Sequence, residues 1–185
     1  YAQTFIKQSG KAEVVLFEGV TPGAVDYSAV VQKIKRSGAE AVLFGGYHPE
    51  ASKIVGQMRQ KRMAIPFVSD DGVKDQTFIK VAGSYAEGVY ASGPKDTTKN
   101  PLAIAAIAEH RKAYRSEPGA FYLNAYAAVQ AVLNAMNKAK STEYNAVSKA
   151  LRTYSTDTPL GKIKFNKQGD AVGAGFSMYQ VRKGA

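Results

Sequence analysis

Short apolar runs alternate with amphipathic stretches in the first half of the chain, and this alternation is the pattern of an α/β fold. Residues 39–44 and 64–69 form two such runs, each of a length that suits a buried strand and each bounded by Gly or Asp. Between them, apolar residues recur at helical spacing from Ala51 to Met58, and Pro49 can occupy the first turn of a helix. This part of the chain therefore predicts a β-α-β unit with parallel strands.

The same alternation continues on both sides of this unit. The predicted elements are a helix end over residues 1–10, a buried strand over 12–19, a loop and then a helix over 21–38, a short helix over 73–88 that Gly83 can break, and a strand over 89–93. Because the first half keeps this β/α rhythm throughout, we expect it to form one sheet with helices packed on it.

The second half has a different pattern. Residues 94–100 lack apolar side chains and predict a linker, and the chain is then nearly all helical until strands return at 161–165 and 175–181. An Ala-rich helix here has an apolar face of Tyr126, Val129, Val132, Leu133 and Met136. An apolar helix face of this kind has to pack on another element, and this half of the chain has few strands for it to pack on. Since the chain starts without Met and inside a helix pattern, we expect the covering sheet to lie before Tyr1.

Composition and charge exclude several classes of protein. A hydrophobic content of 45% supports a packed core, and no apolar run reaches the roughly 18 residues of a membrane span. The absence of Cys excludes disulfides, thiolate catalysis and Cys-containing zinc sites. The net charge of +10 comes from Lys and Arg spread along the whole chain, densest at 59–62 and 162–167, without a nucleic-acid motif. Solvated helix faces explain this charge better than a nucleic-acid partner does.

The sequence offers little catalytic chemistry. The two histidines, His48 and His110, lie in a loop and in a charged helical stretch, and no nucleophile elbow accompanies them. No glycine-rich phosphate loop follows a strand, and no metal-binding spacing is present. An α/β enzyme would need such a motif, so the sequence predicts a protein that is not an enzyme and uses no cofactor or metal.

Binding chemistry lies instead at the ends of the two central strands. Ligands of open α/β sheets bind outside the carboxyl ends of the strands, where Tyr47 follows the first strand and Asp71 and Gly72 follow the second. Neighbouring residues of an extended segment point opposite ways, so we expect one of Asp70 and Asp71 to face a cleft and the other to cap the next helix, with Asp71 as the site candidate. Phe121, at the start of a later helix, offers apolar surface. The alternatives are a strand-capping tyrosine, an N-cap role for Asp71 and a core phenylalanine.

Several stretches of the chain resemble the periplasmic leucine/isoleucine/valine-binding proteins of bacterial ABC importers. These stretches are residues 38–60, 69–73, 82–96, 118–136 and 158–181, and the run GGYHPE at 45–50 is the most specific part. The resemblance covers essentially the whole chain. It implies an α/β fold of the two-lobe, type I periplasmic-binding-protein kind, with a parallel sheet and helices on both faces in each lobe.

The resemblance also implies how the chain divides between the lobes. Residues 1–93 would belong to the second lobe, residues 94–173 would return to the first, and residues 174–185 would add a final strand to the second. Most of the first lobe would then precede Tyr1, as would the first strand of the second lobe. The missing N-terminal part of the same protein is therefore an expected partner of this chain.

As to function, the resemblance implies a periplasmic (or, in a Gram-positive, lipid-anchored) solute-binding component that delivers a small amino acid to an ABC permease in the inner membrane. In this resemblance, Tyr47 matches a tyrosine of the ligand cleft. Asp71 matches the acidic residue that pairs with the ligand's α-amino group, and Gly72 follows it. Phe121 matches an aromatic residue near the ligand's side chain. The residues that hold the ligand carboxylate would precede Tyr1.

Two features of the resemblance leave the ligand and the role of the protein open. Branched-chain amino acid binders usually carry Glu where this chain has Asp71, and related members take other amino acids, amides or aromatic acids. A ligand-sensing domain of a receptor or of a transcription regulator has the same fold, and it remains an alternative.

Overall fold

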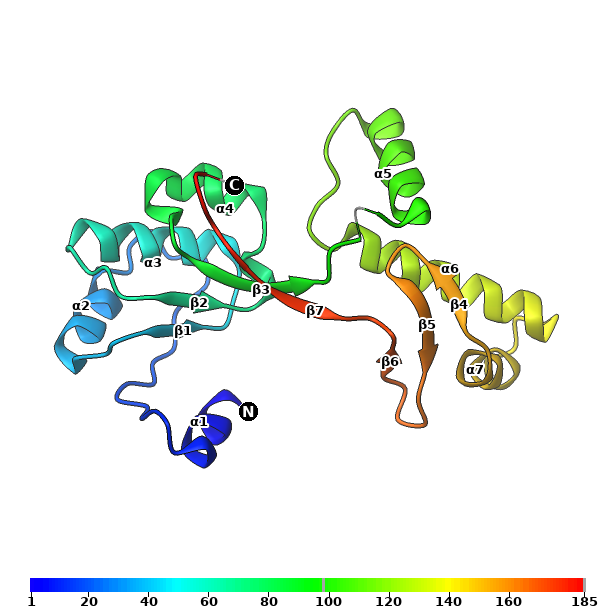
Figure 1. Ribbon diagram of the computed structural model, residues 1–185, viewed down its shortest axis with the longest axis horizontal. Coiled ribbons are helices and arrows are strands. Elements are labelled where there is room, and N and C mark those ends of the chain that lie inside the picture. The colour runs from blue at the N-terminus through cyan, green and yellow to red at the C-terminus, as the bar shows by residue number, and fades with distance from the viewer. Residues whose placement is uncertain (98, 185) are drawn as a thin grey trace. The chain divides into compact units, whose positions relative to one another are not determined.

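The structure is a computed structural model that describes residues 1–97 and 99–184. The chain is an α/β protein that divides into two compact units, Tyr1–Ser92 together with Met178 onward, and Gly93–Ser177. The first unit contains α1 (Ala2–Ser9), α2 (Ser28–Ser37), β1 (Val42–Phe44), α3 (His48–Gln60), β2 (Phe67–Ser69), η1 (Asp71–Val73), α4 (Gln76–Ala82), η2 (Gly83–Ala86), β3 (Tyr90–Pro94) and β7 (Phe176–Gln180) (Figure 1). The second contains α5 (Pro101–Tyr114), α6 (Tyr122–Ala139), α7 (Tyr144–Thr153), β4 (Thr156–Thr158), β5 (Gly161–Phe165) and β6 (Ala171–Val172). In the part of the chain that the structure describes, no helix is both long and apolar enough to cross a membrane.

A four-stranded sheet of order β1-β2-β3-β7 organises the first unit. β1 pairs with β2 in parallel, as does β2 with β3, which confirms the predicted β-α-β unit. The closing segment of the chain returns beside β3, where the backbone N–H of Val181 donates to the carbonyl oxygen of Val89 at 2.9 Å and that of Lys95 donates to Gly175 at 2.8 Å. The carboxyl ends of β1, β2 and β3 therefore meet at one edge of the sheet.

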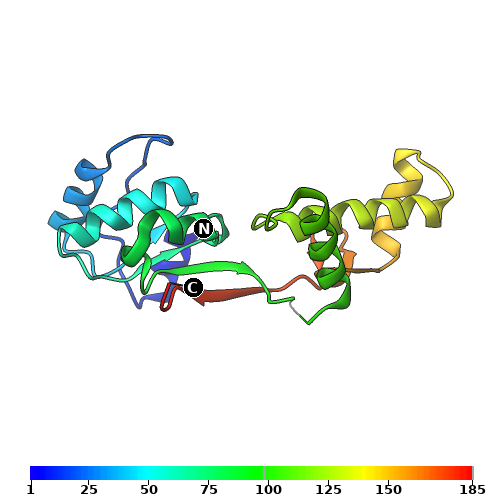
Figure 2. The same cartoon turned by 90° about the horizontal axis from the view of Figure 1, so that it is seen from above.

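The core of the first unit lies between this sheet and the helices α2, α3 and α4. These three helices share one side of the sheet in Figure 1, and Figure 2 shows α3 from above, running along the strands. The largest fully buried side chains are Phe67, Phe78, Ile54 and Met58. Burial of one such side chain stabilises a fold by about 1.5–3 kcal/mol, so these contacts hold α3 and α4 against the sheet. On the other side of the sheet lies α1, which has no buried residue.

The strand predicted over residues 12–19 is not formed, and that prediction is wrong. Leu16 packs partly against the core, but Val15 is 51% and Phe17 77% exposed. A strand requires a neighbour that accepts and donates backbone hydrogen bonds, and the sheet order gives residues 12–19 no such neighbour. The apolar pattern of residues 12–19 indicates a segment suited to burial, but it does not reveal whether a neighbouring strand is present to pair with it.

The second unit packs its helices through small residues. Ala127, Ala131 and Ala135 of α6 are buried, whereas Val129 is 60% and Leu133 55% exposed. α7 and β4 pack against α6, β5 packs against α7, and β6 pairs with β5 in the antiparallel sheet. Val129 and Leu133 are thus exposed on α6, although Met136 packs against the small core that α6 forms with α7. These exposures agree with the expectation that few strands of this chain are available to cover the apolar face of α6.

Candidate ligand-binding site

Two loops meet at the carboxyl edge of the first unit's sheet. β1 ends at Phe44 and β2 at Ser69, and these two residues are paired in the parallel register. The following loops, residues 45–47 and 70–72, therefore begin side by side, and we call them the loop junction. It contains three of the four predicted site residues, namely Tyr47, Asp71 and Gly72.

Asp70 connects the two loops of the junction. Its Oδ2 accepts a hydrogen bond from the backbone N–H of Gly46 at 3.2 Å, and its Oδ1 accepts one from Gly72 at 3.3 Å. Beside it, the buried hydroxyl of Ser69 donates to the carbonyl oxygen of Phe44 at 3.1 Å. Asp70 is the N-cap residue of η1, so it is the member of the Asp70–Asp71 pair that caps the next helix. The bond to Gly46 was not predicted, because that residue lies 24 positions away and no local pattern relates the two.

Gly72 lets the two loops touch at the backbone. A Cβ atom on Gly72 would overlap the carbonyl oxygen of Gly46 and would approach Cδ1 of Tyr47 at 3.0 Å. Only a residue without a side chain fits this close approach. The place of Gly72 in the junction thus has a structural cause that is independent of any ligand.

Asp71 and Tyr47 keep their polar groups available. The side chain of Asp71 makes no hydrogen bond or ion pair with the described residues, and the N-cap position that was its alternative role belongs to Asp70. Tyr47 precedes α3 as its N-cap residue but makes no side-chain cap bond, and it is 64% exposed. A free carboxylate and an exposed phenol therefore lie on two loops in direct backbone contact, an arrangement that can bind an ammonium group.

A third aspartate follows the junction in the sequence and has a structural role. Asp75 caps α4 by accepting the backbone N–H of Thr77 at 2.7 Å. Burial raises the pKa of Asp75, but the hydrogen bonds from Thr77 outweigh this effect, and the nearby His48 and Lys80 add to them. The net pKa lies below its ordinary value of 3.8.

Phe121, the fourth predicted residue, lies in the second unit. It is the N-cap residue of α6 and is 43% exposed, which contradicts the alternative of a core phenylalanine. The following residue, Tyr122, donates its hydroxyl hydrogen to the carbonyl oxygen of Ala106 at 3.0 Å and so connects α6 to α5. The ring of Phe121 is accessible from this anchored helix start.

The first unit also contains a cavity of about 640 Å³ beside the sheet. Residues 13–17 and 41–45 line it together with α1, and Leu43 and Met178 contribute exposed apolar surface. Asp70 reaches its border. A lining of this kind suits an apolar chain segment better than a small polar ligand.

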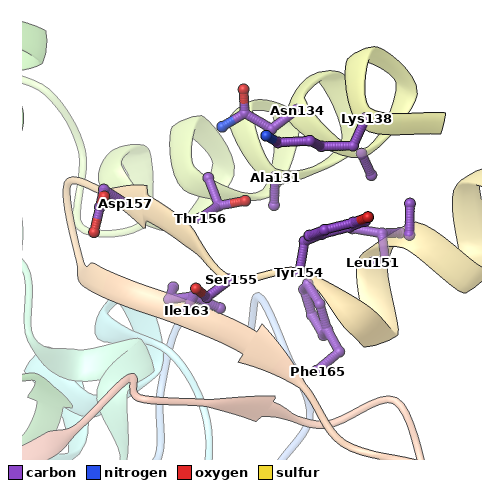
Figure 3. Close-up of a pocket in the computed structure, with 12 residues that line it drawn as sticks. Ala131, Asn134, Lys138, Leu151, Tyr154, Ser155, Thr156, Asp157, Ile163 and Phe165 are labelled. Atoms are coloured by element: carbon purple, nitrogen blue, oxygen red, sulfur yellow. The ribbon is translucent and has the colours of Figure 1, made fainter. Parts of the chain in front are cut away.

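A smaller hollow of about 230 Å³ lies in the second unit, between α6, α7 and the strands β4 and β5 (Figure 3). Its floor is apolar, with Leu151, Ile163 and Phe165. Lys138 lies on the rim with its Nζ 5.8 Å from the centroid of the Tyr154 ring. Sequence reasoning missed this hollow, because its residues come from separate elements and form no motif. Both rim residues are exposed, and no buried polar group points to a bound ligand.

The histidines have no catalytic arrangement. The ring of His110 packs against those of Tyr114, which is tilted, and Tyr122, which meets it edge-on, with ring centroids 4.8 and 4.7 Å away. Its Nδ1 is buried without a hydrogen-bond partner among the described residues. His48 begins α3 and contributes only to the electrostatics of Asp75. Within residues 1–97 and 99–184, neither histidine has a hydrogen bond to a hydroxyl or carboxylate side chain.

Comparison with known proteins gives matches along the entire chain. The family model described as "Periplasmic binding protein" matches residues 1–185. The leucine-, isoleucine-, valine-, threonine- and alanine-binding protein of Pseudomonas aeruginosa is 32% identical over 173 residues, which are 94% of this chain and 46% of that protein. The chain thus spans about half the length of the curated relatives it matches.

Solved structures match the fold. A branched-chain amino acid transporter substrate binding protein of Streptococcus pneumoniae, in complex with isoleucine, is 28% identical with a TM-score of 0.82, and the match covers 100% of this chain and 53% of that one. A solute binding protein of R. palustris, in complex with benzoate, is 19% identical with a TM-score of 0.79. This match covers 96% of this chain and 49% of that one. The second match supports the fold alone.

Proposed function

We propose that this chain, which belongs to the periplasmic binding protein family, forms part of an extracytoplasmic solute-binding protein of an ABC importer. In this role the whole protein binds a small amino acid and delivers it to a membrane permease. Members of the family bind solutes rather than transform them, and the loop junction has groups for binding but no nucleophile with a base. The proposed location is the periplasm, or the outer surface of the membrane with a lipid anchor.

The free carboxylate of Asp71 is the observation that carries this proposal. An amino acid that leaves water loses the hydration of its ammonium group, and this loss is compensated only by an opposite charge and by hydrogen-bond acceptors. Asp71 supplies the charge, and the hydroxyl of Tyr47 on the adjoining loop supplies a further polar contact. Gly72 keeps the two loops in contact, and Phe121 is the proposed apolar contact from the second unit.

The proposed ligand class is a branched-chain or related small amino acid. In its support, the Pseudomonas aeruginosa relative is named for leucine, isoleucine, valine, threonine and alanine, and the Streptococcus pneumoniae structure contains isoleucine. Asp71 is one methylene shorter than the Glu of typical branched-chain binders. An aromatic acid or an amide is the alternative ligand, and benzoate in the R. palustris structure illustrates it.

The proposed partners are the permease and the rest of the two-lobe protein. Large apolar side chains on α6 and along the cavity of the first unit are exposed in the described chain. Surfaces of this kind normally mark interfaces. We propose that the N-terminal part of the same protein covers them.

Titration calorimetry on the full-length protein tests the proposal, with L-leucine and benzoate as the two ligands. We expect L-leucine to bind and Asp71→Asn to lower its affinity by roughly 30-fold or more, since truncating one partner of a buried charge pair costs on the order of 2–5 kcal/mol. Asp71→Glu keeps the charge and serves as the matched control, with a smaller loss. If benzoate binds and L-leucine does not, the ligand carries no amino group and the amino-acid assignment is wrong.

A further inference from the structure

We propose that Asp70 is a positioning residue that sets the Tyr47 loop against the Asp71 carboxylate, an inference that rests on the proposed function. The two oxygens of Asp70 accept hydrogen bonds from two different loops, one from Gly46 and one from Gly72. Tyr47 is the chain neighbour of Gly46, and Asp71 is the chain neighbour of Gly72. Each proposed ligand contact therefore lies one residue from an amide that Asp70 holds.

The chemistry of this contact requires a carboxylate. Both groups that face Asp70 are backbone N–H donors, and an ionised carboxylate offers an acceptor oxygen to each of them. An asparagine offers one acceptor, and its amide nitrogen would turn a donor towards the other N–H. The hydroxyl of Ser69 also lies 3.4 Å from Oδ1 of Asp70. A capping role alone would need only the bond to Gly72.

The other contacts of the junction make the position of Asp70 decisive. Gly72 is buried against the carbonyl oxygen of Gly46, so a small shift of either loop changes their backbone contact. The strands below are paired in register at Phe44 and Ser69, which fixes where the loops begin. The two hydrogen bonds to Asp70 then determine the direction that both loops take after the strands. They thereby determine the distance between the phenol of Tyr47 and the carboxylate of Asp71.

Because both oxygens of Asp70 are occupied, its role differs from that of Asp71. A ligand ammonium group pairs with Asp71, whose oxygens make no bond within the described residues. Asp70 acts through the backbone of both loops. Its removal therefore weakens ligand binding by misplacing two contacts, and it does so without touching the ligand.

The test compares Asp70→Ala and Asp70→Asn with Asp75→Ala in the full-length protein. Asp75 is the matched control, since it also caps a helix by accepting a backbone N–H, but its bond to Thr77 joins no second loop. We expect Asp70→Ala to weaken L-leucine binding about tenfold, because two backbone donors lose their acceptor. Asp70→Asn should weaken it about threefold, because one acceptor is retained. Asp75→Ala should lower the urea midpoint of unfolding by about as much as Asp70→Ala does. It should leave the affinity for L-leucine within twofold of wild type.

Hydrogen exchange of the backbone amides supplies a measurement that does not depend on the ligand. Asp70→Ala should speed the exchange of both Gly46 and Gly72, whereas Asp75→Ala should speed neither. The proposal is overturned if only Gly72 responds, or if Asp70→Ala and Asp75→Ala weaken L-leucine binding equally. If the wild-type protein binds no amino acid, the proposed function fails, while the exchange at Gly46 still decides whether Asp70 joins the two loops.

Discussion

Asp70 and Asp71 are neighbours with the same side chain, but the backbone gives them different surroundings. The carboxylate of Asp70 is turned towards the backbone of two loops, and that of Asp71 makes no bond within the described residues. Asp70 has extended backbone as the N-cap residue of η1, whereas Asp71 is the first residue of that 3-10 helix, and this change of backbone conformation accounts for the difference. At the scale of the residue, the position in the backbone therefore gives two identical side chains different hydrogen-bond surroundings.

Asp75 gives a prediction on pH at the same scale. Its pKa in the folded protein lies below 3.8, so its contribution to stability is present above that ordinary value and is lost as the pH falls through the folded pKa. We expect Asp75→Ala to lower the free energy of unfolding of the full-length protein by about 1 kcal/mol at pH 7, the usual effect of removing an N-cap side chain. The difference from wild type should shrink as the pH is lowered below 3.8.

Urea unfolding of wild type and Asp75→Ala, followed by circular dichroism at neutral and acid pH, measures this difference. Asp75→Asn is a useful control, because asparagine keeps an acceptor for the N–H of Thr77 but carries no charge. A difference between wild type and Asp75→Ala that stays constant down to pH 3 would contradict the assigned pKa direction.

At the scale of the element, α6 is a helix whose buried side is formed by alanines and whose exposed side carries large apolar residues. We expect Leu133→Asp to change the stability of the described chain little, because Leu133 is 55% exposed there. In the full-length protein, where we propose that this face is covered, the same change should destabilise by about 2–5 kcal/mol or more. Urea unfolding of both proteins measures this contrast.

Ala127 on the opposite side of α6 provides the control for this experiment. It is 2% exposed, and Ala127→Leu should destabilise both proteins by about 1–3 kcal/mol through overpacking. Equal effects of Leu133→Asp in the two proteins would mean that no further segment covers α6.

The elements also show how far the sequence alone predicts this structure. Helical and strand periodicity predicted β1, β2, β3, β5, β7 and the helices, because each of these segments carries a repeat of apolar residues in its own sequence, but it did not predict the short strands β4 and β6. The same reasoning failed at residues 12–19, since an apolar run does not reveal whether a neighbouring strand exists. The loop junction followed from strand order, but the bond from Asp70 to Gly46 joins residues 24 positions apart and needs the structure.

At the scale of the whole molecule, exposed apolar surface occurs in both units. Phe17, Leu43 and Met178 are more than half exposed in the first unit, as are Val129 and Leu133 in the second. A soluble monomer rarely leaves so much contiguous apolar surface in water. Since the chain spans about half the length of its curated relatives, we propose that these surfaces meet the remainder of the protein.

This view predicts how residues 1–185 behave by themselves. We expect this chain to associate in solution and to bind L-leucine much more weakly than the full-length protein. The association follows from the exposed apolar faces, and the weak binding follows because the residues expected to hold the ligand carboxylate are not among those at the loop junction. Light scattering measures the association, and titration calorimetry measures the binding. Co-expression with the proposed N-terminal part should give a soluble complex with restored affinity, whereas a monomeric chain that binds L-leucine as tightly as the full-length protein would show that the loop junction suffices.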